Sequence, residues 1–451
     1  LVIFCINFLT FSSISVEAYT INNYHYQNES IESQTNYSIM YSEEGGQREF
    51  IVDAPWKIKE GENIPILIMI RDTDNNAYSF YNIKIYDNYD PNNPKFVKTL
   101  TISDLGLKKD GACFGDDYTT LSQHIWYYNF SLNSNLFKKN SSNSIHINTK
   151  TDGSSCGSGS DPDWSKADNG DLSIFIDNRN LPKLNKWYCG DTHYHSIYTD
   201  TYFSFWGVPL SGEFGAPIGA TIESLNAMGL DWVTITDHSH SFENNGDYKT
   251  CNSSRNTFKN DCNSYSKCLI GEEINCDYTS STSGGNHYLG YQLDNLLLDN
   301  FEKCKPTNNN YRCSEVVNQV FSQNGFGYVA HPMTEIDALF ADLINVINPW
   351  GDYSLQFIGL EIWNEDIKNL KDGLDLDLIP DGEQRMAELE DGLEKWKDIL
   401  LGRKGLKSRK VFISAGSDAH GDFNTAFGKE YTCVYAPFYS KENIFTGLKK
   451  G

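Results

Sequence analysis

The sequence predicts an α/β protein in which a small all-β sandwich precedes a larger barrel of alternating strands and helices. Short β-rich runs fill residues 51–180, strand and helix patterns alternate after Trp187, and metal-ligand residues follow many of the later strands. A chain of 451 residues is too long for one ordinary core, so we expect two domains. Aromatic residues make up 14% of the chain, which indicates packed structure rather than disorder.

The first residues are typical of a secretory signal. An apolar stretch runs to Val16 and is followed by Glu17 and Ala18, which together resemble the apolar region and cleavage site of a signal whose beginning is missing. We therefore predict a signal over residues 1–18 and a protein that is secreted or retained in the lumen of the secretory pathway. The alternative is an uncleaved anchor, which needs about 20 apolar residues, so no stable membrane insertion is expected. Residues 19–50 are polar, and we expect them to be poorly ordered.

Residues 51–180 are expected to form the sandwich. Turn-forming Asp, Asn, Gly and Pro separate short β-rich runs that show no helical periodicity between them. The predicted strands cover residues 64–70, 78–86, 95–102, 125–132 and 172–176. A Gly/Ser/Asp-rich linker or loop is expected over residues 151–170. We find no candidate chemistry in this half.

Residues 187–451 are expected to form the barrel, because strand and helix patterns alternate there as in parallel βα units. After a first strand that ends near His193, strands are predicted at residues 232–236, 269–270, 288–293, 327–330, 357–362, 411–415 and 431–435. Helices are predicted at residues 220–228, 314–323, 337–347, 383–401 and 442–451. In the helix over 383–401 the apolar residues form one helical stripe, which indicates packing against the sheet.

The cysteines favour disulfide bonds. Removal of the signal would remove Cys5 and leave ten cysteines, an even number that suits an oxidising compartment. Five of them lie between Cys251 and Cys304, where disulfides could brace long loops, although the sequence does not determine the pairing. A zinc-thiolate site is disfavoured because no spacing is C-x-x-C. Five Asn-x-Ser sequons fit a glycosylated surface: Asn28, Asn36, Asn129, Asn140 and Asn252.

The charge balance excludes nucleic acid as a general partner. The chain has 37 Lys and Arg against 60 Asp and Glu, a formal charge of -23, so most of its surface would repel a phosphate backbone. Bound divalent cations would reverse the sign locally and could attract an anionic substrate. The expected partner is therefore a small-molecule substrate.

Metal-ligand residues recur at the ends of the predicted barrel strands. Six of the seven histidines after Trp187 occupy such positions or, for His287, open a strand. Imidazoles and carboxylates are the ligands that hold Zn, Mn or Fe, and a barrel brings the ends of its strands to one rim. The candidate metal ligands are His193, His195, Asp200, His238, Glu273, His287, His331, Asp418 and His420.

Strand geometry explains the spacing within these clusters. Residues two apart in a strand point to the same face, so His193 and His195 can share one metal, and Asp418 and His420 can enter the same cavity. Glu273 could bridge two ions about 3.5–4 Å apart, the separation at which they share a hydroxide. Glu272 stands beside it and leaves the identity of the bridging carboxylate open.

Taken in order, these elements resemble the PHP superfamily, named for its polymerase and histidinol phosphatase members. The matching elements are His-x-His with a downstream Asp, the segment Gly-Leu-Asp-Trp-Val-Thr-Ile-Thr-Asp-His at 229–238, Gly-x-Glu, Ala-His-Pro, Gly-Leu-Glu-Ile-Trp-Asn at 359–364, and Gly-Ser-Asp-Ala-His. The resemblance covers about residues 187–451. The lead-in Trp-Tyr-Cys-Gly-Asp at 187–191 looks most like the branch that cleaves carbamates and other amide or ester bonds. The resemblance implies a distorted (βα)7 barrel with two or three divalent metal ions.

The resemblance also implies a role for each ligand. The first metal would take His193, His195, Glu273 and Asp418, and the second would share Glu273 and take His287 and His331. The third would take Asp200, His238 and His420. The family's Ser-Asp-Gly is replaced here by Thr199-Asp200-Thr201, which puts Asp200 in doubt as a ligand.

The leading functional hypothesis is hydrolysis by a metal-bridging hydroxide, with Glu273 and Asp418 as the central carboxylates. His240 could protonate the leaving group, although a supporting or surface role is the alternative. Asp237 and Glu361 could orient ligating imidazoles.

Phosphoesters are the favoured substrates because they suit the superfamily at large. Amide, carbamate or ester hydrolysis at the same site is the alternative, because the sequence lacks an Arg-rich cluster for phosphate. Two further alternatives remain open: a catalytically inactive secreted binding protein, and an unrelated enzyme with a lone structural metal.

Overall fold

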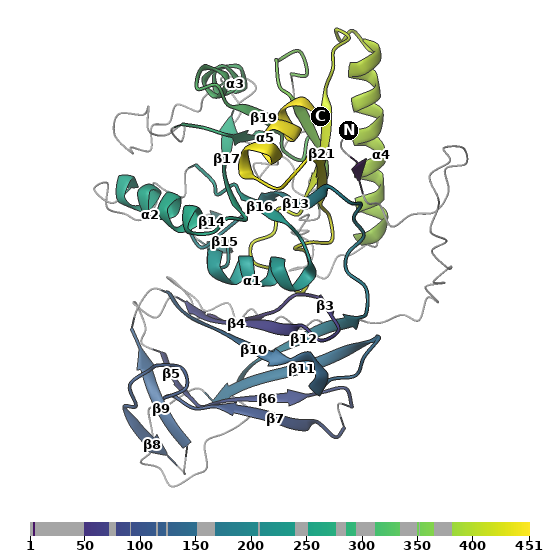
Figure 1. The fold of residues 1–451 in the computed structure, drawn as a ribbon. Helices are drawn as coiled ribbons and strands as arrows, with labels where there is room; N and C mark the ends of the chain where they lie inside the picture. The colour runs from purple at the N-terminus through teal and green to yellow at the C-terminus, as the bar shows by residue number, and fades with distance from the viewer. Residues whose placement is uncertain are drawn as a thin grey trace.

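The computed structural model describes residues 3–4, 49–71, 78–90, 92–113, 116–122, 125–150, 167–205, 208–239, 251–276, 286–294, 312–333, 350, 352–364 and 381–451. The strands before residue 180 form small separate sheets below a larger sheet that is flanked by helices (Figure 1). The molecule is therefore a mixed α/β protein with an all-β first part, as the sequence predicts.

Two sheets of the first part enclose its core. One has the order β10-β4-β2 and the other the order β3-β12-β11-β6-β7, while a third small sheet has the order β5-β9-β8. The strands are β2 (Glu49–Asp53), β3 (Lys57–Lys59), β4 (Asn63–Arg71), β5 (Tyr78–Tyr81), β6 (Ile83–Asp87), β7 (Lys95–Leu100), β8 (Gly111–Cys113), β9 (Asp116–Leu121), β10 (Ile125–Asn133), β11 (Ser141–Lys150) and β12 (Ala167–Asp177), with a short 3₁₀ turn η1 (Ser134–Leu136).

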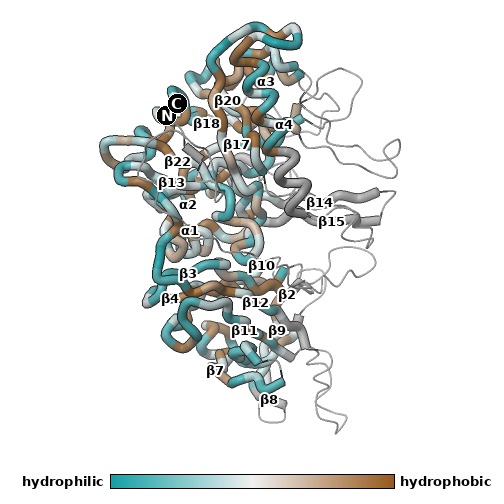
Figure 2. Tube along the Cα trace, turned by 90° about the vertical axis from the view of Figure 1, so that its right-hand side faces the viewer, coloured by the Kyte–Doolittle hydropathy of each residue, from teal (hydrophilic) through white to brown (hydrophobic). Residues whose placement is uncertain are grey.

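Alternation along β4 explains how this part meets the rest of the chain. Ile64, Ile66, Ile68 and Ile70 face the sandwich core, whereas Leu67 and Met69 on the opposite face pack into a core shared with the barrel half. Strand β4 is therefore buried on both faces. Figure 2 shows hydrophobic residues concentrated along the central strands of both halves.

Two strands of the first part differ from expectation. The predicted run over 78–86 breaks at Asn82, whose side-chain oxygen accepts the N–H of Ile102 at 3.1 Å, so β5 and β6 join different sheets. Strand β11 was not predicted because it is rich in Ser and Asn. Its alternating Ile145 and Ile147 are fully buried. Pairing with β12 and β6 provides hydrogen-bond partners for its backbone N–H and C=O groups.

The second part is organised around a nine-stranded sheet with the order β1-β22-β13-β16-β17-β18-β19-β20-β21. Its strands are β1 (Ile3–Phe4), β13 (Trp187–Tyr194), β16 (Trp232–Ile235), β17 (Cys268–Cys276), β18 (Asn286–Tyr291), β19 (Phe326–Val329), β20 (Gly359–Asn364), β21 (Phe412–Gly416) and β22 (Thr432–Tyr435). The sheet nearly closes because the end of β21 meets β13: Thr192 donates to the carbonyl of Ala415 at 3.1 Å, and the N–H of Asp418 donates to His193 at 2.9 Å.

The described residues form a nearly closed barrel-like sheet but do not confirm the distorted (βα)7 barrel that the resemblance implies. Strand β18 is antiparallel to both β17 and β19, and β22 is antiparallel to β13. The connection over residues 277–285 is shorter than the roughly dozen residues that a parallel crossover needs, so β17 and β18 form a hairpin. A second hairpin, β14 (Asp200–Phe205) with β15 (Val208–Phe214), was also not predicted.

The helices agree in part with the sequence. They are α1 (Ile218–Met228), α2 (Cys251–Ser264), α3 (Cys313–Ser322), α4 (Asp381–Leu401) and α5 (Lys441–Lys450). Helix α2 was missed because its sequence is Asn/Ser-rich, yet Phe258 and Cys262 are four residues apart and fully buried. The helix predicted at 337–347 lies outside the described residues.

Three disulfides link described cysteines. Cys189 of β13 bonds to Cys433 of β22, Cys262 of α2 to Cys268 of β17, and Cys276 of β17 to Cys313 of α3. Such bonds are typical of proteins that mature in an oxidising compartment, as the even cysteine number indicated.

The predicted signal lies outside the described residues except for β1, which pairs with Thr432 and Cys433. The segment over residues 19–48 and most of the predicted linker over 151–170 also lie outside them. No helix within the described ranges has the length and apolar character needed to cross a membrane.

Candidate metal centre

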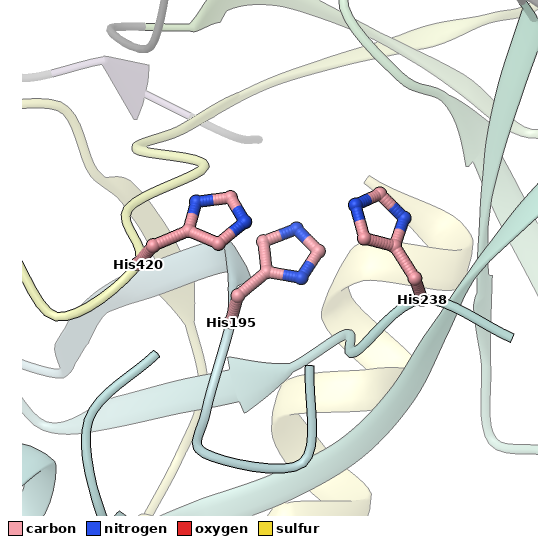
Figure 3. A group of neighbouring side chains, drawn as sticks. All are labelled: His195, His238 and His420. Carbon is pink, nitrogen blue, oxygen red and sulfur yellow. The ribbon is translucent and has the colours of Figure 1, made fainter. Parts of the chain in front are cut away.

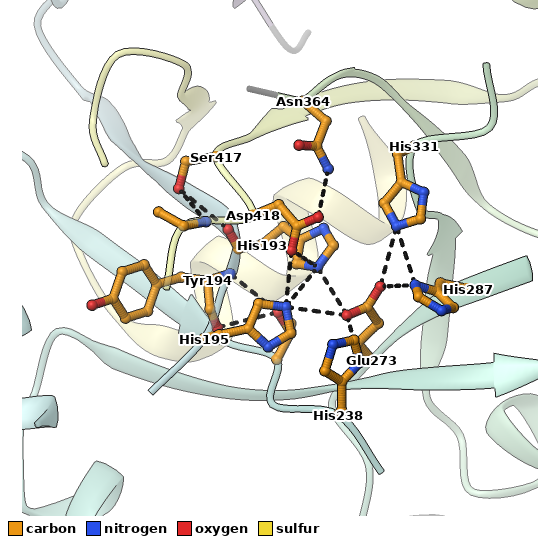
Figure 4. Close-up of polar contacts among 12 residues, drawn as sticks. His193, Tyr194, His195, His238, Glu273, His287, His331, Asn364, Ser417 and Asp418 are labelled. Carbon is orange, nitrogen blue, oxygen red and sulfur yellow. Dashed lines mark hydrogen bonds and ion pairs between the residues drawn. The ribbon is translucent and has the colours of Figure 1, made fainter. Parts of the chain in front are cut away.

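Six histidines and two carboxylates converge where the barrel strands end (Figure 4). His193 belongs to β13 with His195 just beyond it, His238 follows β16, Glu273 lies in β17, and His331 follows β19. Asp418 and His420 follow β21. His287 lies at the start of β18, and because that strand is antiparallel its start reaches the same rim as the ends of its neighbours.

The first group consists of His193, His195, Glu273 and Asp418. The Nε2 atoms of His193 and His195 lie 3.2 Å apart, and they lie 3.0 and 2.9 Å from Oδ1 of Asp418. The same two nitrogens lie 3.3 and 3.1 Å from Oε2 of Glu273. These four residues are the set expected for the first metal, and the structure brings all of them together.

Glu273 is shared with the neighbouring histidines. Its Oε1 lies 2.5 Å from Nδ1 of His287 and 3.2 Å from Nε2 of His331, and its Oε2 lies 3.0 Å from Nδ1 of His238. Glu272 has a different partner, because the hydroxyl of Ser239 donates to it. Glu273 is thus the carboxylate that lies among the histidines.

Among the described residues, a second group of candidate ligands consists of three imidazoles. His195 lies between His238 and His420, with ring centroids 4.5 and 4.2 Å away (Figure 3). His238 and His420 were expected to share a third metal with Asp200. The side chain of Asp200 and all of His240 lie outside the described residues, and the structure groups these two histidines with His195.

Burial and neighbouring charges shift the pKa values of the residues in this cluster strongly. Burial alone would raise the pKa of Glu273, but His287, His238 and His193 hold it well below its usual range. Burial opposes the ionised form of Asp418 in the same way, and His193 keeps its pKa well below the ordinary value. For His193, burial lowers the pKa, yet Asp418, Glu361 and Glu273 raise it well above its usual value. The negative charge of Glu273 and Asp418 therefore favours a cation beside them, and a divalent ion can supply that positive charge.

The donor set fits a divalent metal ion. Two ligand atoms on a tetrahedral zinc ion, each about 2.0–2.1 Å from it, lie about 3.3 Å apart. The nitrogen and oxygen atoms of the first group lie 2.9–3.3 Å apart, close to that spacing. These buried His, Glu and Asp groups could therefore hold metal ions.

Contacts behind the ligands fix their ring tautomers. The hydroxyl of Thr199 donates to Asp237 at 2.9 Å and so accepts from Nδ1–H of His195 at 3.0 Å, which leaves the Nε2 lone pair of His195 facing the cluster. Nδ1 of His193 lies 3.0 Å from Glu361 with the same effect. Asp237 thus acts through Thr199, whereas Glu361 contacts an imidazole directly.

We expect Thr199→Val to weaken metal binding by about 10- to 100-fold, the usual cost of losing a partner of a ligating histidine. The valine is similar in size but cannot accept from His195, so the ring is free to present the wrong tautomer. Competition with a chelator of known affinity measures the change, and Thr199→Ser should restore binding. Wild-type affinity in the valine variant would contradict this role.

Sequence reasoning missed other supporting residues. Asn364 donates to Oδ2 of Asp418 at 3.1 Å and to Glu361 at 3.3 Å, so it holds the carboxylate with Oδ1 turned to the histidines. Asp191 accepts the backbone N–H groups of His193 and Ser417 at 3.0 Å and ties the two ligand segments together. Burial raises the pKa of Asp191 to about 7, although hydrogen bonds from Ser417 and His193 oppose that rise. Both residues lie inside the motif segments, but only the fold shows their partners.

Comparisons with known proteins add little to this picture. No protein-family model matches the chain, and no curated protein matches it. Among solved structures, the CARDB domain of a Pyrococcus furiosus protein, in complex with di-metal ions, is 7% identical over 32% of this chain and 99% of that one, with a TM-score of 0.19. A beta-glucosidase from Listeria innocua is 13% identical over 31% of this chain, with a TM-score of 0.17, and the match spans 17% of that enzyme. Likenesses this weak support no conclusion about fold or function.

Proposed function

We propose that this protein is a secreted hydrolase that depends on two or three divalent metal ions, Zn, Mn or Fe, and acts on small phosphoesters. The observation that best supports this is the position of Glu273, whose two oxygens lie within 3.3 Å of five imidazoles. A structural zinc site needs four ligands, so eight converging ligands exceed what one structural ion requires.

One ion would be held by His193, His195, Glu273 and Asp418, and a second by Glu273, His287 and His331. His238 and His420 would hold the third, together with Asp200 as the PHP resemblance implies. When bound, divalent ions lower the pKa of water toward neutrality and polarise a phosphoryl or carbonyl oxygen, so no Ser or Cys nucleophile is needed.

The residues of the chain prepare the site for this chemistry. Glu361 and Thr199 keep the Nε2 lone pairs of His193 and His195 turned inward. Both of these imidazoles are fully buried, whereas the side chains of Asp418 and His287 remain 15% and 14% exposed. Substrate would therefore approach past Asp418 and His287. Protonation of the leaving group by His240 remains part of the proposal.

Amide, carbamate or ester substrates are the second candidate. Within the described part of the chain, Glu273 and Asp418 pair with histidines and with no Arg or Lys. A phosphate site commonly includes an Arg that binds two phosphate oxygens. Because Glu273 and Asp418 have no such neighbour within the described residues, the site suits an acyl substrate as well.

We expect His193→Ala to abolish metal-dependent turnover while leaving the fold intact, because its ring contacts both carboxylates of the first group. The metal-loaded wild type would be assayed against phosphomonoester, phosphodiester and acyl panels, which also separates the two substrate classes. His146→Ala is the matched control, since His146 lies in the sandwich and pairs with Asp171. Full activity of the His193 variant in metal-scrubbed buffer would refute the mechanism.

A further inference from the structure

The sandwich contacts the segment that contributes two of the candidate ligands. Asp53, the last residue of β2, is only 6% exposed. Its Oδ2 accepts the N–H of Phe423 at 2.8 Å, and its Oδ1 accepts the N–H of Asn424 at 3.0 Å and that of Ala54 at 2.8 Å. The barrel residues in this contact begin three positions after His420.

Asp53 caps a turn that belongs to another part of the fold. The N–H groups of Thr425, Ala426 and Phe427 all donate to the carbonyl of Asp422, which makes residues 422–427 a hydrogen-bonded turn. The first N–H groups of such a turn have no partner within it, and Asp53 accepts two of them. Burial, together with Asp422, raises the pKa of Asp53 to about 8, while the three N–H groups oppose the rise. The fold thus buries this carboxyl at an energetic cost.

Further hydrogen bonds hold the same turn against the sandwich. The side chain of Asn424 donates to the carbonyls of Ala54 and Ser173 at 3.0 Å and accepts the N–H of Ser173 at 3.0 Å. Trp56 donates its backbone N–H to Phe423 at 2.9 Å and its indole N–H to Phe427 at 3.1 Å. The contact therefore consists of several hydrogen bonds, and it involves both β2 and β12.

The turn directly continues the ligand segment. Asp418 and Asp422 have φ angles of 53° and 43°, a conformation that L residues rarely hold without support, and Gly421 has 89°. On the barrel side, Asp418 donates to His193 and Ala419 accepts from His195, both at 2.9 Å. The other end of the segment is fixed by the contact with Asp53.

We propose that Asp53 is a positioning residue for the metal centre, so that the sandwich fixes the segment 418–422 and with it the imidazole of His420. This inference rests on the proposed function, because it assumes that His420 helps to hold a cation with His238. His420 is tied to this backbone twice: its N–H donates to Asp422 at 3.2 Å, and its Nδ1 lies 3.0 Å from the carbonyl of Asp418. A shift of the turn would therefore move the ring.

Zinc titration of the full chain tests the proposal. Asp53→Ala and Asp53→Asn would be dialysed against graded free Zn²⁺, and bound zinc per chain would be measured by elemental analysis. Asparagine keeps the size of the side chain but turns an N–H₂ group toward an N–H donor, so both variants should disturb the turn. We expect the weakest zinc site to lose at least about tenfold in affinity, as His420→Ala should, while the tighter sites change little.

Asn143→Ala is the matched control within the sandwich. Asn143 is 2% exposed, and its side chain makes hydrogen bonds with Lys138, Ser141 and Ile174 in the first part of the chain. This variant should lower the melting temperature without losing zinc. If the Asp53 variants do not fold, Asn424→Ala removes the side-chain bonds while leaving the backbone N–H for Asp53, and it should weaken the same site.

The possible outcomes separate the two proposals. A wild type that binds no zinc, manganese or iron would refute the proposed function itself. A wild type that binds metal, together with Asp53 and Asn424 variants of unchanged zinc affinity, would overturn the positioning role alone.

Discussion

Glu273→Gln should remove metal binding and hydrolysis together, and we expect it to be the most damaging single change in the site. Glu273 is 1% exposed and supplies both oxygens to the histidines: Oε1 to His287 and His331, and Oε2 to His193, His195 and His238. Glutamine keeps the size but loses the negative charge and replaces one acceptor with an N–H₂ donor. That donor would face the nitrogen lone pairs meant for the metal.

The expected loss in metal affinity exceeds about 100-fold, the upper end of what losing a partner behind a ligand costs. Turnover measured at saturating Mn²⁺ or Zn²⁺ should fall at least as far, because the shared carboxylate would be missing from both neighbouring groups.

Glu272→Gln is a close control for this experiment. Glu272 is the preceding residue on the same strand, is fully buried, and accepts from the hydroxyl of Ser239. Its substitution should lower stability but leave metal affinity within a few-fold of wild type. Equal metal loss in both variants would mean that general damage to β17, and not the charge of Glu273, is responsible.

The sequence was sufficient to predict that these side chains meet. The ligands that the structure brings together, except His287, lie at or just beyond a predicted strand, and two-residue spacing placed His193 and His195 on one face. His287 could not be explained from the pattern, because it opens a run instead of ending one. The antiparallel direction of β18 explains it, and that direction depends on the short connection after Cys276.

What the sequence could not supply were contacts between residues far apart in the chain. Thr199, Asn364 and Asp53 are small polar residues of ordinary type, and only their partners make them important. Asp53 contacts residues 370 positions later in the chain, and no local pattern encodes such a pairing. Helix α2 was missed for a related reason, since Phe258 and Cys262 give it a buried face only within the complete fold.

Removing the Cys189–Cys433 disulfide should destabilise the metal-free protein more than removing either of the other two described disulfides. The three bonds span sequence separations of 244, 37 and 6 residues. In the chain-entropy account, a crosslink stabilises by restricting the unfolded chain, and the effect grows with the logarithm of the loop. The expected losses are about 5, about 4 and about 2 kcal/mol respectively.

Paired Cys→Ala variants allow a fair comparison, because all six cysteines are at most 3% exposed and lose similar packing. Free energies of unfolding would be measured by urea titration without metal, so that metal binding does not contribute. Equal losses in the three variants would show that local packing, and not loop length, sets the stabilisation. The Cys189–Cys433 bond also concerns the site, since it joins β13, which carries His193, to β22. The loop closed by this bond contains every candidate metal ligand, so it restricts all of them in the unfolded chain.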